Sequence, residues 1–138
     1  IDWAVPSLVT AHYSPYSFMV EENGSMLGVP VPLFNLVYHD CMVVPWMMDA
    51  DQPEGDYMLY ALLNGGAAYL NCEAEGKELE KEIERYRTVA QLQEKVAYSE
   101  MVRHEFLDGN YKKQRTVFAD GTEVTVDLEA GTYQIHQN

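Results

Sequence analysis

Val31-Pro-Leu-Phe-Asn-Leu-Val-Tyr-His-Asp40 is the stretch on which the fold assignment depends. Seven of its ten residues are apolar or aromatic, counting Pro32, and they do not alternate with polar residues. This pattern is typical of a parallel strand that is covered on both faces. Pro30 and Pro32 lie at the start of the run, where a strand tolerates proline. Apart from Asn35, the polar residues lie at the C-terminal end, so the sequence predicts a buried strand with a polar tip.

A helix and a second short strand are expected after this run. Residues 41–55 form a loop that carries an acidic tract. Asp56–Asn64 contains helix-forming residues, with apolar side chains at positions 58, 59, 62 and 63. Gly65-Gly66 ends this helix, because glycine is favoured just past a helix end. Ala67–Asn71 is the second strand, and the order strand, loop, helix, strand has about the size of a βαβ unit.

Lys77–Leu107 is the longest segment with helical periodicity. Its apolar residues, at positions 79, 83, 86, 89, 90, 92, 96, 102 and 106, roughly follow one face of a helix. Charged residues fill the other face, several of them as opposite charges three or four positions apart. Gly76 precedes the segment and Asp108-Gly109-Asn110 ends it. We therefore expect a long helix, with a kink or break because about thirty residues exceeds the usual helix length.

The C-terminal residues favour β structure. Arg115–Ala119 and Thr122–Asp127 flank Asp120-Gly121, which supplies the positive φ angles of a two-residue type I′ turn. Gly131–Ile135 has the composition of a third strand. Three short strands cannot bury a large core by themselves, so we expect them to pack on the long helix or on partners outside this sequence.

The order of these segments resembles the C-terminal part of bacterial glycoside hydrolases with a (β/α)₈ barrel. The likeness spans Val29 to Ile135 and is carried by four strings in order: Pro32–Asp40, Leu-Leu-Asn-Gly-Gly at 62–66, Arg103–Leu107 and Val117–Val124. Endo-α-N-acetylgalactosaminidases and uncharacterised relatives are the most similar group. The resemblance implies an α/β fold in which 1–107 form the last barrel units, including the long helix, and 108–138 begin a C-terminal β domain. The alternative is a small stand-alone α+β domain.

The resemblance also implies a function. Such enzymes hydrolyse glycosides with a pair of carboxylates, which usually lie on middle strands of the barrel. This sequence does not contain those strands, so no catalytic residue is assigned and we expect no activity without the rest of the barrel. The implied partners are a carbohydrate substrate and the remainder of a parent polypeptide, and the implied location is extracellular or periplasmic, in a secreted bacterial protein. The alternative function is a non-catalytic carbohydrate- or protein-binding module.

The candidate substrate-binding residues lie at the expected C-terminal ends of the two strands, where barrel enzymes build their active sites. They are Tyr38, His39, Asp40, Trp46, Asn71 and Glu73. His39 and Asp40 can bond sugar hydroxyls, and a carboxylate accepts two donors, which suits a vicinal diol. The alternative is that both residues bond loop backbone groups. The apolar face of a sugar stacks on an indole such as Trp46, but a core position beside Met47 and Met48 fits equally well.

The net charge excludes some classes of partner. The chain of 138 residues has 9 basic and 22 acidic side chains, which gives a formal charge of −13. Such a chain has no electrostatic attraction to phosphate backbones or to anionic membrane surfaces. No run approaches the roughly 18 consecutive apolar residues of a membrane span. A neutral sugar remains compatible, and no phosphate-binding glycine loop or other cofactor motif is present.

Metal binding and disulfide formation receive little support. Four clustered acidic residues could bind calcium, but their spacing lacks the EF-hand pattern and favours a solvated loop: Asp49, Asp51, Glu54 and Asp56. Cys41 and Cys72 could pair, although two buried free thiols are the favoured interpretation, and neither has the spacing of a zinc site. Because the sequence opens on Ile1 without a methionine, we expect the natural protein to begin further upstream.

Overall fold

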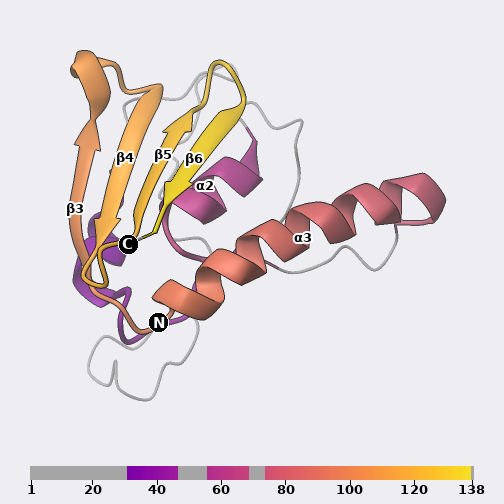
Figure 1. The fold of residues 1–138 in the computed structure, drawn as a ribbon, viewed down its shortest axis with the longest axis horizontal. Coiled ribbons are helices and arrows are strands. Elements are labelled where there is room, and N and C mark those ends of the chain that lie inside the picture. Colours follow the sequence, from indigo (N-terminus) through magenta and orange to yellow (C-terminus); the bar gives the residue numbers. More distant parts are fainter. Residues whose placement is uncertain (1–30, 47–55, 69–73, 138) are drawn as a thin grey trace, which may run out of the picture.

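The computed structural model describes residues 31–46, 56–68 and 74–137. These residues form three α-helices, a two-stranded parallel sheet and a four-stranded antiparallel sheet (Figure 1). In chain order the elements are α1 (Leu33–Tyr38), β1 (Pro45–Trp46), α2 (Tyr57–Leu63), β2 (Ala67–Ala68), α3 (Gly76–Val96), β3 (Met101–Phe106), a 3₁₀ turn (Leu107–Gly109), β4 (Lys113–Phe118), β5 (Glu123–Asp127) and β6 (Thr132–His136). The mixture of helices and strands agrees with the expected α/β class. Neither sheet closes on itself, so the described residues show no barrel.

The strand expected over 31–40 is wrong, because this run forms the short helix α1. Pro32 stands immediately before the helix, where its missing N–H costs nothing. Its carbonyl accepts the N–H of Leu36 at 2.9 Å, and the Asn35 carbonyl accepts that of His39 at 3.0 Å. An apolar run without alternation fits a buried strand or a helix segment equally well, since periodicity alone does not separate them. Here the helical hydrogen bonds decide.

The expected βαβ unit is present, but its first strand lies later in the chain. β1 and β2 pair in parallel, with Pro45 opposite Ala67 and Trp46 opposite Ala68. The helix predicted over 56–64 is confirmed as α2, whose N-terminus is capped by the Asp56 carboxylate accepting the N–H of Met58 at 2.8 Å. The segment after Ala68, where the second strand was expected to continue, lies outside the described residues.

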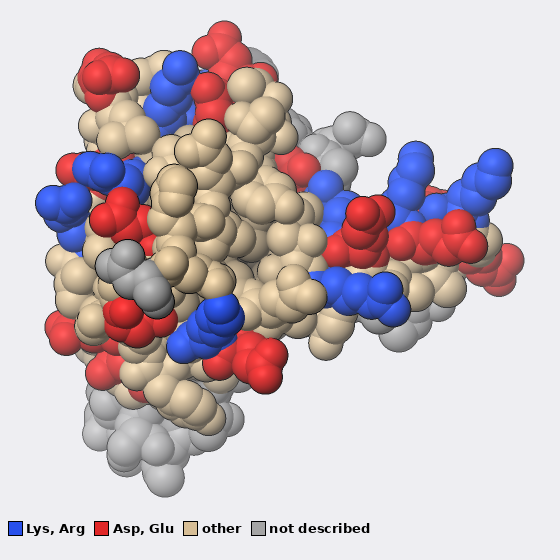
Figure 2. Space-filling model, in the orientation of Figure 1, with Lys and Arg blue, Asp and Glu red and all other residues tan. Residues whose placement is uncertain are grey.

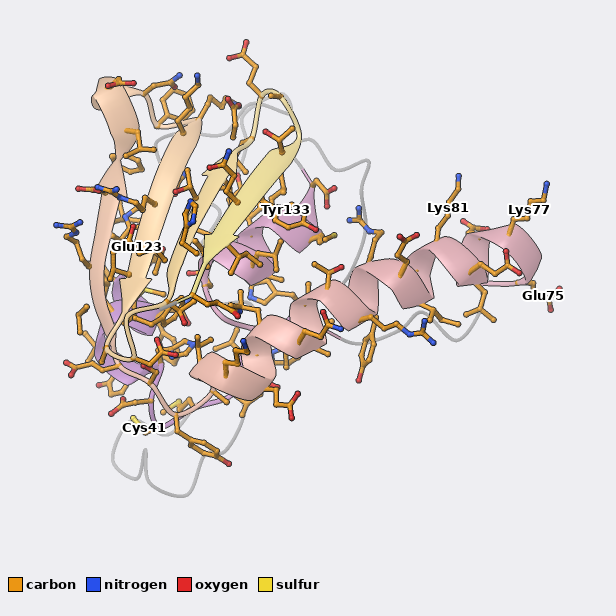
Figure 3. The ribbon with its side chains drawn as sticks, viewed as in Figure 1. Cys41, Glu75, Lys77, Lys81, Glu123 and Tyr133 are labelled. Carbon is orange, nitrogen blue, oxygen red and sulfur yellow. The ribbon has the colours of Figure 1, made fainter. Side chains whose placement is uncertain are left out.

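The long helix expected over 77–107 is confirmed as α3 as far as Val96, where the chain breaks, but it is wrong for the residues that follow. α3 ends at Val96, and the chain turns into β3, which pairs antiparallel with β4. Tertiary pairing therefore overrides a sequence whose apolar spacing continues to fit a helix. Figure 1 shows the N-terminal half of α3 projecting away from the four-stranded sheet, and Figure 3 labels Glu75, Lys77 and Lys81 at its free end. No residue from Gly76 to Thr88 is buried. Of the described helices, none is long and apolar enough to cross a membrane.

The predicted C-terminal hairpin and third strand are confirmed as β4, β5 and β6, with β3 as an additional strand in the order β3-β4-β5-β6. The turn differs from the expected two-residue type. Four residues, Ala119–Thr122, lie between the two strands, and of these only Gly121 has a positive φ, at 88°. A type I′ turn needs positive φ at both central residues. Because β3 pairs with β4, the expected domain boundary after residue 107 falls between two neighbouring strands of one sheet.

One hydrophobic core joins the helices to the sheet. It contains residues 58–63 of α2, Val89, Leu92 and Val96 of α3, and the inward residues Phe118, Val124 and Val126 of the sheet. The outward sheet face is charged: Lys113 and Asp127 form an ion pair of 3.4 Å, and Arg115 bonds Glu105. Figure 2 shows acidic and basic side chains mixed along α3. The core side of the sheet therefore faces α2 and the C-terminal end of α3.

Candidate functional site

The C-terminal ends of β1 and β2 define the candidate site. The two strands are parallel and adjacent, so their last residues, Trp46 and Ala68, lie at the same edge, and segments 47–55 and 69–73 follow them in the sequence. In open α/β sheets this edge is where ligands bind. Asn71 and Glu73, two of the residues expected to bind substrate, belong to the second of these segments and lie outside the described residues.

Trp46, the last residue of β1, is a core side chain. Its ring stacks on Tyr60, with centroids 6.0 Å apart and planes 9° apart, and meets the edge of Tyr57 at 6.1 Å. Gly66 lies close to the indole, because a β-carbon there would be 2.5 Å from Trp46 Cδ1. These contacts agree with the core position considered from the sequence. A role in shaping the edge of the site is more compatible with this packing than direct stacking on a sugar.

His39 lies at the C-terminal end of α1, not at a strand tip, and is buried. Its Nδ1 is 2.7 Å from the carbonyl oxygen of Ser99, and its Nε2 is 3.2 Å from that of Gly65. The ring also packs on Phe118 with a centroid distance of 5.0 Å. His39 thus joins three segments: α1, the turn between α2 and β2, and the turn between α3 and β3. This geometry matches the alternative in which the imidazole satisfies backbone groups.

Two buried asparagines, Asn35 on α1 and Asn64 just after α2, bond to each other, and the sequence analysis did not single them out as a pair. Asn35 Nδ2 donates to Asn64 Oδ1 at 2.8 Å, and Asn64 Nδ2 donates to the Tyr60 carbonyl at 2.8 Å. Asn35 Oδ1 has no hydrogen-bond partner among the described residues. The usable signals were an isolated Asn inside an apolar run and an Asn directly before Gly65. This chain of amides fixes α1 against the end of α2.

Tyr38 and Asp40 are the described candidates that reach solvent. Tyr38 is half-buried, with its ring 5.2 Å from that of Phe34, and Asp40 is exposed. The Cys41 thiol, also exposed, donates to Asp40 Oδ1 at 3.5 Å. Partial burial, together with the neighbouring Asp40 carboxylate, raises the pKa of the Cys41 thiol, so it stays protonated and weakly reactive at neutral pH. The expected burial of Cys41 is wrong, and Cys72 lies outside the described residues.

Of the four acidic residues considered as a calcium site, only Asp56 lies within the described residues, and its carboxylate is already bonded. Asp56 Oδ1 accepts the N–H of Met58, and its two oxygens bond Nη1 and Nη2 of Arg85 on α3. The carboxylate therefore caps α2 and ties it to α3. Asp49, Asp51 and Glu54 lie outside the described residues, and within the described ranges no group of three or more acidic, histidine or cysteine side chains could hold a metal ion.

Several solved structures of one enzyme are similar to this chain. No family model matches the chain, and no curated protein does. A quadruple mutant of the α-N-acetylgalactosaminidase NagBb from Bifidobacterium bifidum matches with a TM-score of 0.86 and 54% identity, over 99% of this chain and 22% of that chain. Its complex with GalNAc matches with 0.83 and 52%, over 98% and 23%. The complex with Gal-NHAc-DNJ matches with 0.84 and 50%, over 99% and 24%.

The chain resembles one part of a glycoside hydrolase. It spans less than a quarter of the length of the solved chains that it matches. The matched chains are those of a carbohydrate-active hydrolase.

Proposed function

We propose that this chain is part of a larger glycoside hydrolase that acts on terminal α-linked N-acetylgalactosamine, and that it contributes one wall of the sugar site. The observation that carries the proposal is the identity of 50–54% over nearly the whole chain with an α-N-acetylgalactosaminidase, combined with a TM-score of 0.82–0.86. Identity at this level over a common fold favours a common substrate class. The catalytic carboxylates and the barrel strands that hold them are assigned to the remainder of the polypeptide.

The proposed contacts divide into residues that touch the sugar and residues that hold them in place. Asp40 presents an exposed carboxylate, and Asn71 and Glu73 come shortly after β2 in the sequence, where α/β enzymes often carry ligand-binding residues. We assign these three, with Tyr38, to hydrogen bonds with sugar hydroxyl and acetamido groups. His39 and Trp46 are buried, and we assign them to positioning the end of α1 and the end of β1. By family resemblance, the enzyme is proposed to be extracellular or periplasmic.

The test is hydrolysis of p-nitrophenyl α-GalNAc by the purified parent polypeptide, compared with p-nitrophenyl α-galactoside. We expect kcat/KM to favour the acetamido sugar by at least about 100-fold, because a site built to bond a polar group rejects an analogue that lacks it. The 138-residue chain alone should be inactive toward both. Absence of activity in a folded parent, or equal activity on the two sugars, would contradict the proposal.

The binding residues are tested separately in the parent enzyme. Asn71→Ala and Glu73→Gln should each raise KM several-fold, since one hydrogen bond contributes about 0.5–1.5 kcal/mol. Glu78→Gln, on the exposed first turn of α3, is the matched control and should leave KM unchanged. An unchanged KM in Asn71→Ala and Glu73→Gln would remove these residues from the site while leaving the hydrolase proposal intact.

A non-catalytic binding module is the second candidate. Its support is the continuous core that joins α2 and α3 to the four-stranded sheet, which is what a self-sufficient domain requires. This function would show as GalNAc binding by the 138-residue chain, measured by calorimetry, together with no hydrolysis by the parent. Hydrolysis by the parent, with no binding by the isolated chain, would exclude it.

A further inference from the structure

The helix α1 buries its polar side chains and exposes two of its apolar ones, while two others, Phe34 and Leu36, pack partly on the core. Asn35 is 0% exposed and His39, just after the helix, is 5% exposed. Leu33 and Val37, one turn apart, are 66% and 62% exposed, and Val31 just before the helix is 46% exposed. A helix on the surface of a soluble domain has the opposite arrangement, with its apolar stripe toward the core. We call Val31, Leu33 and Val37 the outer face of α1.

The buried side of α1 cannot be exchanged for the outer face. Asn35 bonds Asn64, and His39 bonds the backbone of two turns, so both polar residues are held inward by specific hydrogen bonds. Rotation of the helix would bury Leu33 and Val37 but leave those partners unsatisfied. α1, drawn in indigo in Figure 1, packs against β3, and its outer face points away from the core.

The composition of α1 suits a surface that is covered. Residues 31–38 contain no charged side chain, in a chain with a net charge of −13. Covering this face therefore desolvates no charge, and the cores of protein interfaces are depleted in charged residues. Single exposed aliphatic residues are ordinary, but a contiguous set one helical turn apart indicates an interaction surface.

We propose that the outer face of α1 packs against an apolar surface of the remainder of the same parent polypeptide. This inference rests on the proposed function, in which the chain is part of a larger enzyme. This chain covers only 22–24% of each matched enzyme chain, so more than three quarters of such a polypeptide lies outside it. Because the remaining polypeptide is covalently linked to this chain, it is present in a one-to-one ratio and at a high effective concentration next to α1. Burying Leu33 and Val37 there removes apolar area from water, while His39 and Asn35 hold the helix in register from the other side.

The experiment compares one double variant, Leu33→Gln with Val37→Gln, in the 138-residue chain and in the parent. Glutamine equals leucine and exceeds valine in helix propensity, so neither substitution weakens the helix itself. In the isolated chain, where the face is exposed already, we expect the melting temperature to stay constant and solubility to stay equal or rise. In the parent we expect the apparent melting temperature to fall by at least about 3 °C, with faster proteolysis. Tyr98→Gln, at a residue 90% exposed outside α1, should change neither protein.

A labelling measurement covers the case in which the double variant fails to fold. Leu33→Cys is placed in a background with Cys41→Ser and Cys72→Ser, and its reaction with a maleimide is timed. Rapid labelling in the isolated chain and at least about tenfold slower labelling in the parent support the interface, because reaction requires an accessible thiolate. Equal labelling rates, or equal effects of the double variant in the two contexts, would overturn it. A dimer of the isolated chain that is lost in the double variant, with the parent unaffected, would assign the face to a second copy.

Failure of this inference is separable from failure of the proposed function. Hydrolysis of p-nitrophenyl α-GalNAc is measured on the same wild-type parent preparation. If the parent is inactive but the double variant destabilises it, the interface proposal stands and the substrate proposal fails. If the parent is active but the double variant does not change its stability, the substrate proposal stands and the interface proposal fails.

Discussion

Gly65 lies directly against the imidazole of His39, and a β-carbon at residue 65 would be 2.5 Å from His39 Nε2. The same β-carbon would be 2.8 Å from Val96 Cγ2 and 2.9 Å from Phe118 Cζ. Gly65 also has φ of +59°, a conformation that ends α2 and favours glycine. One residue therefore closes the helix, presents its carbonyl to His39 and leaves room for the core. Both the turn and the histidine depend on the absence of a side chain here.

Gly65→Ala is expected to destabilise the isolated chain by about 2–5 kcal/mol, adding the cost of positive φ to that of overpacking. Gly131→Ala is the matched control, because Gly131 has φ of +66° but no atom within 4 Å of its β-carbon position. Its cost should be about 1–2 kcal/mol. Urea unfolding of both variants measures the difference. Equal losses would show that the contacts with His39, Val96 and Phe118 relax freely.

His39 and Asp40 are adjacent but should give opposite signatures. His39→Leu leaves the carbonyls of Ser99 and Gly65 without their partner, so we expect a loss of about 2–4 kcal/mol in unfolding free energy. Asp40→Asn, at an exposed position, should change stability by less than about 0.5 kcal/mol. In the parent enzyme, Asp40→Asn should raise KM. A stable His39→Leu variant with raised KM would instead assign the imidazole to the sugar.

The parts of the fold that sequence predicted correctly are those with strong local signals. The helix over 56–64 has an Asp at its start and glycines at its end, and the hairpin over 115–127 has an Asp-Gly turn between alternating strands. Each of these signals acts within a few residues, so it does not depend on the rest of the fold. The turn type was missed because Ala119 and Thr122 also lie between the strands, which a two-residue template does not include.

The errors arise where distant contacts decide. The run 31–40 has no periodicity that separates strand from helix. Apart from Asn35, its polar residues were expected at an exposed end, but Asn35 and His39 are both buried. At β3, Met101–Phe106 fits a helical face, but pairing with β4 gives the backbone a better set of partners. The polar residues after α1 and β2 stay predictions from their position in the sequence, whereas the supporting roles of Trp46 and Asn64 depend on packing.

Asp56 serves both as the cap of α2 and as the ion-pair partner of Arg85, and two substitutions separate these roles. Asn is as good a cap as Asp, so Asp56→Asn removes mainly the ion pair. The pair is about a fifth exposed on each side, which places its loss between that of surface and buried pairs, at about 1–2 kcal/mol. Asp56→Ala should cost about 1 kcal/mol more. Thermal or urea unfolding measures both, and equal losses would mean that the cap contributes nothing.

Lys113→Met is the control for that comparison. Lys113 pairs with Asp127 at 3.4 Å, but its side chain is 46% exposed, so screening by water leaves the pair with little effect on stability. We expect a change below about 0.5 kcal/mol. A loss as large as that of Asp56→Asn would show that exposure does not distinguish the two ion pairs.

His104 should make the stability of the chain depend on pH near neutrality. Burial lowers the pKa of His104, outweighing the opposing effects of the Gln114 hydrogen bond and the Glu105 carboxylate. Gln114 Nε2 donates to the Tyr111 carbonyl, so its Oε1 faces His104 and the histidine Nε2–H donates to it at 2.8 Å. The folded state thus favours the neutral ring, whereas the unfolded chain binds a proton near the ordinary imidazole pKa of about 6.5.

This linkage fixes the sign of the pH effect. Stability from the neutral His104 ring is present above about pH 6.5 and is lost as the pH falls through that value toward the lower folded pKa. His104→Gln cannot titrate, so urea unfolding from pH 8 to pH 5 should show a shallower decline than wild type, with the two curves separating most below about pH 6.5. Asp127→Asn is the control: backbone N–H groups of Ala130 and Glu129 and the Lys113 ammonium lower the pKa of Asp127, so its effect on the slope should appear only below about pH 4. Parallel curves for wild type and His104→Gln over the whole range would show that the protonated ring is accommodated in the folded sheet.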